Sequence, residues 1–278
     1  MDRIRRNERL AVMTRILVAN PNKIFTLGTF CQMLGSAKST LSEDIDILQG
    51  VFMDFRLGKL ETVTGAAGGV RYRPMVEAGK ALQGVTALAE RLCEPGRVLP
   101  GGFVYMADIL AMPDLVEEMG AIVATQYYRL EPDFVLTMET KGIPVALMTA
   151  RALGVPLVIV RRDSKVYEGP AVNINYLSGS GGRIETMSLS RRAVREGQRA
   201  LIVDDFMRAG GTARGMVDMM KEFSVTVVGI CVLLSTVEPV RKRVENVRSL
   251  LTMEGIDETG HQALIRPSVW LQQAVEKN

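Results

Sequence analysis

The segment with the most specific chemistry in this sequence is a pair of carboxylates followed by a glycine-rich turn. Asp204 and Asp205 end the apolar run 200–203, and Gly210 and Gly211 precede Thr212. Carboxylates accept hydrogen bonds from hydroxyl groups, and adjacent glycines let backbone N–H groups converge on an anion. The spacing therefore predicts a cradle for a sugar phosphate. The alternative is an acid pair that merely ends a strand before an ordinary turn.

The elements that must position this segment follow from hydrophobic patterning. Short apolar runs predict strands at 133–138, 156–160, 199–203 and 225–234, and amphipathic stretches predict helices at 143–153 and 213–223. Alternating strands and helices form a parallel sheet whose ligands lie beyond the carboxyl ends of the strands. The expected fold is α/β, with a doubly wound parallel sheet. A helix that begins after Thr212 would also direct its positive dipole end at a phosphate.

Two further loops leave the carboxyl ends of these expected strands, and both carry cations that suit a polyphosphate. The first contains Thr140, Lys141 and Gly142, and the second contains Arg161, Arg162 and Lys165. A helix-capping turn and a solvated charge run are the alternatives. The segment 176–190 is rich in glycine and serine at one end and strand-like at the other, which is typical of a flap that closes over a ligand or of a plain surface hairpin.

These features together resemble the phosphoribosyltransferases, which bind phosphoribosyl pyrophosphate (PRPP). The resemblance implies that Asp204 and Asp205 hold the ribose hydroxyls, that the two cationic loops face pyrophosphate, and that 208–212 wraps the 5′-phosphate. Phe206 follows the acids where a nucleobase would lie, with a core position as the alternative. The residues expected to bind PRPP after the acid pair are Phe206, Met207, Arg208, Ala209, Gly210, Gly211 and Thr212.

The first part of the chain has a different pattern. Apolar residues at helical spacing predict a helix that ends at 20–22, a second short helix at 27–34, and a third that follows a turn at Gly35 with Ser36 as its N-cap. Two strands, 59–64 and 70–73, flank a glycine-rich tip. This order predicts a winged helix-turn-helix domain, in which the first turn of the last helix meets base edges in the major groove of DNA.

Several polar residues of this domain are candidates for contacts with DNA. Lys38, Ser39 and Thr40 lie off the apolar stripe of the third helix, and Arg71 and Arg73 share one face of a strand. Each arginine alone could equally be a solvated surface charge, and nearby acids would repel phosphate if they faced it. The residues expected at the interface are Lys38, Ser39, Thr40, Lys59, Arg71, Arg73, Arg3, Arg5 and Arg6, with Arg9 as a further candidate.

Composition excludes several classes of function. The net charge is +3, and the first 73 residues carry eleven lysines and arginines against seven acids, which favours a polyanionic partner for that part. The three cysteines are far apart and His261 is the single histidine, so we expect no metal site, no disulfide framework and no Ser-His or Cys-His catalysis. The charged start and strand-length apolar runs predict a cytoplasmic protein without a membrane span.

Over nearly its full length the chain resembles the purine operon repressors of Gram-positive bacteria. The resemblance implies a winged-helix DNA-binding domain at 1–74 and a PRPP-binding, phosphoribosyltransferase-like domain at 75–278. It further implies a homodimer that binds operator DNA upstream of purine synthesis genes and is released by PRPP, with Mg²⁺ accompanying PRPP and guanosine tetraphosphate as a competing ligand. The motifs that carry it are at 36–44, 65–70, 140–144, 185–189 and 204–212.

Position 208 bears on whether the expected pocket catalyses a reaction. Many purine phosphoribosyltransferases carry there an acid that interacts with the purine, whereas Arg208 cannot accept a proton. We therefore expect no catalytic residues and an enzyme fold used for effector binding. The first alternative is an active purine phosphoribosyltransferase of the xanthine type with an appended nucleic-acid-binding domain. The second is a PRPP-binding subunit whose basic domain contacts protein.

Overall fold

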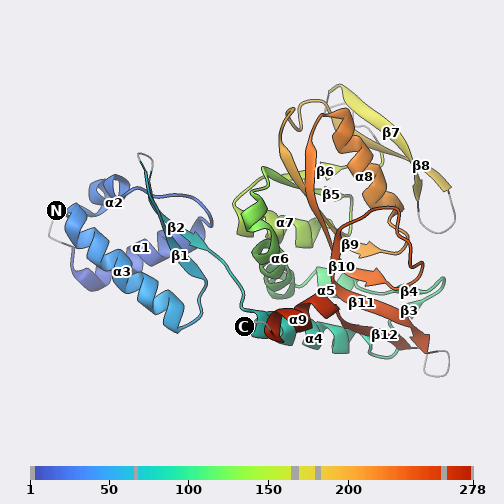
Figure 1. Cartoon of the computed structure of the whole chain (residues 1–278), viewed down its shortest axis with the longest axis horizontal. Coiled ribbons are helices and arrows are strands. Elements are labelled where there is room, and N and C mark those ends of the chain that lie inside the picture. The colour runs from blue at the N-terminus through green and yellow to red at the C-terminus, as the bar shows by residue number, and fades with distance from the viewer. Residues whose placement is uncertain (1–3, 66–67, 164–168, 179–182, 258–261, 277–278) are drawn as a thin grey trace. The chain divides into compact units, whose positions relative to one another are not determined.

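The computed structural model of the whole chain describes residues 4–65, 68–163, 169–178, 183–257 and 262–276 (Figure 1). The chain divides into two compact units, one formed by Met1–Glu77 with Arg151–Gly154 and the other by Ala78–Ala150 with Val155–Asn278. The division after Glu77 lies close to the domain boundary expected after residue 74. No helix in the described ranges is long and apolar enough to cross a membrane.

The first unit is a winged helix-turn-helix fold, as predicted. Its elements are α1 (Arg6–Ala19), α2 (Leu27–Leu34), α3 (Lys38–Asp54), β1 (Lys59–Val63) and β2 (Gly69–Arg73). The two strands are antiparallel, with Lys59 opposite Arg73, and they form the wing. Met13, Phe30 and Leu41 are fully buried at the centre of a core built by all three helices and the wing, because each helix presents one apolar stripe inward.

One local expectation for the first unit is wrong. Ser36 does not cap α3, because its hydroxyl donates to the carbonyl oxygen of Leu34 at 3.2 Å, and the N-cap position is taken by Ala37. The preceding helix is capped conventionally, since the Thr26 hydroxyl accepts from the N–H of Thr29 at 3.1 Å. Gly35 ends α2 in the left-handed conformation, and this sharp turn carries Ser36 back over α2 instead of forward onto α3.

The second unit is a doubly wound α/β fold around a six-stranded sheet of order β12-β11-β10-β9-β5-β6. Neighbouring strands are parallel except for the antiparallel edge strand β12. Figure 1 shows α6 and α7 on one side of this sheet and α8 with the β7–β8 hairpin on the other. The sheet strands are β5 (Phe134–Met138), β6 (Leu157–Val160), β9 (Arg199–Met207), β10 (Thr226–Thr236), β11 (Val247–Asp257) and β12 (Gln262–Pro267).

The helices and the two small hairpins complete this unit. The helices are α4 (Ala78–Leu92), α5 (Ala107–Leu110), α6 (Pro113–Tyr127), η1 (Tyr128–Leu130), α7 (Ile143–Leu153), α8 (Gly211–Glu222) and α9 (Val269–Glu276). The hairpins are β3 (Val98–Leu99) with β4 (Phe103–Val104), and β7 (Ala171–Ser178) with β8 (Arg183–Ser190). The tip of the expected flap, 179–182, and part of the wing tip, 66–67, lie outside the described residues.

Two elements of the second unit differ from the sequence-based prediction. Strand β9 does not stop at the acid pair but continues to Met207, because β10 extends to Thr236 and pairs with the backbone of Phe206 and Met207. The region 238–278, which carries no interpretable motif and was expected at most to form a helical cap or tail, contains the two strands β11 and β12 as well as the helix α9. The ends of these strands thus depend on pairing with neighbouring strands that are distant in the sequence, and a local sequence pattern does not contain that information.

Candidate functional site

A pocket of about 810 Å³ lies at the carboxyl edge of the sheet, where β5 and β9 end. It brings together three groups of predicted residues that are distant in sequence, namely Thr140 and Lys141, Arg162, and the whole stretch from Asp204 to Thr212. Arg161 does not line the pocket and instead pairs with Glu139 at 3.4 Å. Lys165 lies outside the described residues. The structure therefore brings these loops together at one edge of the sheet, and binding of a polyphosphate sugar there stays a prediction.

Residues 208–212, called the phosphate-binding loop after their predicted role, lie between β9 and the first turn of α8. Gly210 is the N-cap of α8 and has a φ of 79°, a left-handed conformation that favours glycine. The first turn of any helix leaves N–H groups without intrahelical partners and carries the positive end of the dipole. The sequence predicted that α8 begins after Thr212, whereas it begins at Gly211. The loop and the helix start thus provide the kind of N–H donors to which an anion can bind, and anion binding here stays a prediction.

The acid pair differs in environment from an exposed pair of carboxylates. Asp204 is 8% exposed, and its burial, together with the adjacent charge of Asp205, raises its pKa well above the usual value. Burial also raises the pKa of Asp205, while its hydrogen bond with Asp204 and the charge of Lys141 oppose that rise. The N–H of Asp205 donates to Asp204 Oδ1 at 3.0 Å. Asp204 therefore holds a proton at higher pH than an ordinary aspartate.

Gly142 sits directly beneath the acid pair. A Cβ at this position would overlap Asp204 Oδ1 and lie 2.5 Å from Thr137 Oγ1. Within the described part of the chain, the buried hydroxyl of Thr137 has no hydrogen-bond partner. The predicted turn at 140–142 thus contributes a cation, Lys141, to the pocket and a glycine that lets the loop after β5 pack closely against Thr137 and Asp204.

A wall of the pocket comes from the β7–β8 hairpin, which includes the described part of the segment 176–190 that the sequence predicted as a flap or a plain surface hairpin. Tyr176 Oη donates to Glu185 Oε2 at 2.8 Å, and Ser178 Oγ donates to Glu185 Oε1 at 2.8 Å. These two bonds hold the pKa of Glu185 below its usual value, and burial raises the pKa of Tyr176 to about 12. The wall is ordered by its own hydrogen bonds before any ligand contacts it.

The opposite end of the pocket is apolar and aromatic. Phe206 lines it and packs against Phe103 of the β3–β4 hairpin, with ring centroids 6.2 Å apart and an interplanar angle of 56°. Phe103 is 52% exposed, so these rings form a surface against which a planar ligand can stack. Phe206 therefore faces the pocket instead of the core. No sequence pattern predicted the β3–β4 hairpin, because each strand is only two residues long.

In the first unit, the structure places most predicted DNA contacts on the surface. Lys38 and Ser39 are exposed in the first turn of α3, and Thr40 beside them is half-buried. Arg5 is exposed, and so are Arg6 at the start of α1 and Lys59 at the start of β1, although each of the latter two forms an ion pair with an acid. Arg3 lies outside the described residues.

The two wing arginines share a partner. Arg71 Nη2 lies 2.8 Å and Arg73 Nε lies 3.1 Å from Glu61 Oε2, so the three side chains form one ion-pair cluster. Arg73 is 8% exposed, whereas Arg71 is half-buried. Arg71 is therefore the better placed of the two for a phosphate, and Arg73 is placed to brace the wing. Contact of either with DNA stays a prediction.

Arg9 and Asp44 form a buried pair that removes both from the surface. Arg9 Nε lies 2.6 Å from Asp44 Oδ2, and the two side chains are 8% and 0% exposed. Arg9 joins α1 to α3 and is not available to DNA. Because Asp44 is neutralised inside the unit, it does not contribute the repulsion of phosphate that the sequence suggested.

Comparison with known proteins matches each of the two units to a protein family. The family model "Bacterial purine repressor, N-terminal" matches residues 5–74, and the model "Phosphoribosyl transferase domain" matches residues 107–264. The chain is 44% identical to the purine biosynthesis transcriptional repressor of Bacillus subtilis, over 92% of this chain and 90% of the relative. This chain belongs to the bacterial purine repressor family. The expected family and the winged-helix plus phosphoribosyltransferase fold are confirmed.

Other members of the purine repressor family and more distant relatives agree. A purine biosynthesis transcriptional activator of Lactococcus lactis is 41% identical, with 91% of this chain and 94% of the relative covered. A xanthine phosphoribosyltransferase of Deinococcus deserti is 31% identical over 63% of this chain and 95% of that protein. The adenine phosphoribosyltransferase of Rhodothermus marinus shares the fold of the second unit, with a TM-score of 0.52, 21% identity, and coverage of 62% of this chain and 99% of that one.

Proposed function

We propose that this protein represses transcription of purine biosynthesis genes by binding operator DNA as a homodimer in the cytoplasm, and that PRPP releases it from DNA. The observation that carries this proposal is the pairing in one chain of a winged-helix unit with a pocket whose lining residues suit a phosphorylated sugar. The relatives that cover both units are named as regulators of purine biosynthesis, which supports the same assignment.

The chemistry of the pocket favours PRPP. The phosphate-binding loop suits the 5′-phosphate, Asp204 and Asp205 suit the ribose hydroxyls, and Lys141 and Arg162 suit the pyrophosphate. Among the described residues, no group of three or more potential ligands could hold a metal by itself. Mg²⁺ would therefore be held mainly by the oxygens of PRPP, with a carboxylate of the acid pair as a protein ligand. Guanosine tetraphosphate, a polyphosphate with a planar base, suits the same pocket and its aromatic end.

The test is equilibrium binding of the purified protein to fluorescently labelled DNA from upstream of a purine synthesis gene, titrated with PRPP at fixed salt. Specific binding that PRPP reverses is the expected result. The matched variant is Asp205→Ala, which should bind the DNA as tightly as the wild type but need a much higher PRPP concentration for release. Specific DNA binding that PRPP leaves unchanged would refute release by PRPP. Sedimentation of the free protein tests the dimer.

The direction of regulation needs its own measurement, because relatives of similar identity are named as repressors in one species and as activators in another. We expect the protein to lower the yield of transcript from a purine promoter in a reconstituted transcription assay, and PRPP to restore it. A higher yield with the protein than without it would assign an activator.

A second function, purine phosphoribosyl transfer, has one observation in its favour, namely similarity to xanthine phosphoribosyltransferases. Arg208 argues against it, because this exposed pocket residue cannot take a proton from a purine. We expect no nucleotide product when the protein is incubated with PRPP, Mg²⁺ and xanthine. Release of pyrophosphate that depends on the purine base would assign an active enzyme.

A further inference from the structure

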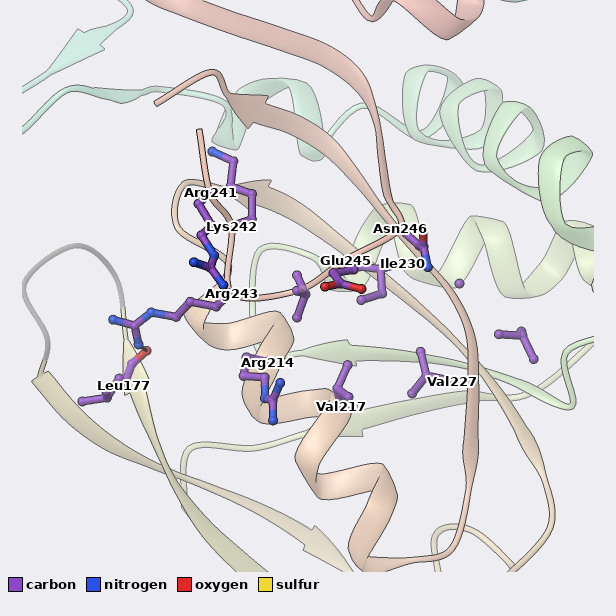
Figure 2. Close-up of a pocket in the computed structure, with 13 residues that line it drawn as sticks. Leu177, Arg214, Val217, Val227, Ile230, Arg241, Lys242, Arg243, Glu245 and Asn246 are labelled. Atoms are coloured by element: carbon purple, nitrogen blue, oxygen red, sulfur yellow. Dashed lines mark hydrogen bonds between the residues drawn. The ribbon is translucent and has the colours of Figure 1, made fainter. Parts of the chain in front are cut away.

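The segment 237–246, which connects β10 to β11, packs against the outer side of the phosphate-binding loop. Lys242 Nζ donates to the carbonyl oxygen of Arg208 at 2.5 Å and to the carbonyl oxygen of Thr236 at 2.6 Å. The N–H of Arg243 donates to the carbonyl oxygen of Ala209 at 2.9 Å. Figure 2 shows Lys242 and Arg243 side by side on this segment, above α8. Two consecutive carbonyls of the loop are thus held from outside the pocket.

Because the peptide bond is planar, the hydrogen bonds to the outer carbonyl groups also fix the direction of the N–H groups on the pocket side of the loop. In a trans peptide, the carbonyl and the following N–H point in opposite directions. The Arg208 carbonyl points to Lys242 and the Ala209 carbonyl points to Arg243, so the N–H groups of Ala209 and Gly210 point away from the segment. Both residues line the ligand pocket. The N–H groups that an anion would use are therefore aimed by donors outside the pocket.

The segment is also anchored at a second point, which fixes its position. Arg243 Nη1 donates to the carbonyl oxygen of Leu177 at 3.2 Å, in the strand that carries the pocket residues Tyr176 and Ser178 (Figure 2). Val244 packs against Gly210, since a Cβ at Gly210 would lie 3.2 Å from Val244 Cγ2. A segment tied to both the loop and the β7–β8 hairpin is able to hold the loop in one conformation.

We propose that Lys242 is a positioning residue for the phosphate-binding loop, which it pre-forms for the 5′-phosphate of the ligand by holding the Arg208 carbonyl. The inference rests on the proposed binding of PRPP. Lys242 does not line the ligand pocket, so it acts through the loop and not by touching the ligand. Among the described residues, its acceptors are two carbonyl oxygens and the Thr236 hydroxyl, all of them uncharged. Preorganised donors lower the cost of ordering a site when the ligand binds.

The test compares Lys242→Met with Arg241→Met by calorimetric titration of three probes: PRPP, ribose 5-phosphate and inorganic pyrophosphate. Arg241 is an exposed neighbour on the same segment, so its variant removes one positive charge without removing a donor to the loop. For Lys242→Met, loss of a charged hydrogen bond should raise the dissociation constants of PRPP and ribose 5-phosphate about tenfold. The dissociation constant of pyrophosphate should stay unchanged, because pyrophosphate uses Lys141 and Arg162. For Arg241→Met, the dissociation constants of all three probes should stay within about twofold of the wild-type values.

Several outcomes would overturn the inference. Wild-type affinity for PRPP in Lys242→Met, or an equal weakening by Arg241→Met, would remove the positioning role. Equal weakening of all three probes with a lower melting temperature would assign a general structural role. If Lys242→Met does not fold, Lys242→Gln, which keeps an N–H donor, must show an intermediate and phosphate-selective loss. If the wild type binds PRPP but the variants match it, this inference alone fails, whereas a wild type that binds no probe refutes the proposed function as well.

Discussion

At the scale of single residues, the pocket contains a buried carboxyl group, Asp204, whose ionised form is unfavourable in the free protein. Asp204 is buried beside Asp205, and within the described residues no cation forms an ion pair with it. Burying a carboxylate without a compensating charge is unfavourable, so the free protein keeps a proton on Asp204 to higher pH than the unfolded chain does. Hydroxyl groups of a bound sugar would supply the missing donors.

Asp204→Asn should therefore stabilise the ligand-free protein and weaken PRPP binding. In the wild type, the raised pKa makes the free energy of unfolding fall as the pH rises from the ordinary aspartate pKa towards the raised value, because the folded state binds more protons there. The variant should lose most of this decline, so its free energy of unfolding at pH 8 should exceed that of the wild type. Denaturant unfolding at pH 5 and pH 8 measures it, and an unchanged pH dependence would contradict the prediction.

At the scale of elements, helix α3 and the wing each carry exposed polar residues that can contact DNA and buried charged residues that stabilise the fold. The first turn of α3 exposes Lys38 and Ser39, while Arg9 and Asp44 lock α1 to α3 from the inside. In the wing, Arg71 and Arg73 lie on the same face and share Glu61, yet differ in exposure. The two arginines should thus respond differently to truncation.

Arg71→Ala should weaken DNA binding and reduce its dependence on salt, because one phosphate contact releases about one counterion. Arg73→Ala should instead lower the stability of the first unit by about 1–3 kcal/mol, since it leaves Glu61 and the buried wing less well paired. DNA affinity at several salt concentrations, with thermal unfolding of each variant, separates the effects. Equal losses of stability in both variants would contradict this division.

The start of α8 provides a second test at the scale of an element. Gly210→Ala should destabilise the protein by about 1–2 kcal/mol and weaken PRPP, because alanine disfavours a φ of 79° and its Cβ would press on Val244. Gly197→Ala is the matched control, since Gly197 has the same φ and no atom near its Cβ position. It should lose similar stability and keep the affinity of the wild type for PRPP. A loss of affinity in both variants would argue against a local effect at the loop.

At the scale of the whole molecule, recognition of DNA and of ligand lie in separate units, each with its own core. The chain passes from β2 to α4 through residues 74–77. Communication between the sites requires two states of the protein with different affinities for DNA and for PRPP. The coupling is then a property of the full chain and not of either pocket or helix.

Thermodynamic linkage gives this coupling a quantitative test. If PRPP lowers the affinity for operator DNA by a given factor, saturating operator DNA must lower the affinity for PRPP by the same factor. Calorimetric titration of PRPP into the free protein and into the DNA complex should give equal ratios, with the coupling on the order of 1–3 kcal/mol. Unequal factors would mean that PRPP acts by a route other than the same protein's two states, such as direct chelation of Mg²⁺ from the DNA.

The sequence by itself determined the parts of this protein that depend on short-range pattern. The helices Leu27–Leu34 and Ile143–Leu153 have the predicted bounds, the wing strands follow from periodicity, and the turn at Gly210 and Gly211 follows from turn chemistry. These features are set by neighbours along the chain, so they can be predicted locally. The motifs around the acid pair were also specific enough to indicate the family.

Only the tertiary structure decided which distant side chains meet. It paired Arg9 with Asp44 and Arg73 with Glu61. The two arginines, which the sequence predicted at the surface, therefore form ion pairs inside the first unit. It brought Tyr176, Glu185 and Phe103 into the pocket and set Lys242 behind the phosphate-binding loop. No local pattern specifies such partners, because each contact gains its free energy from burial and geometry that exist only when the chain has folded.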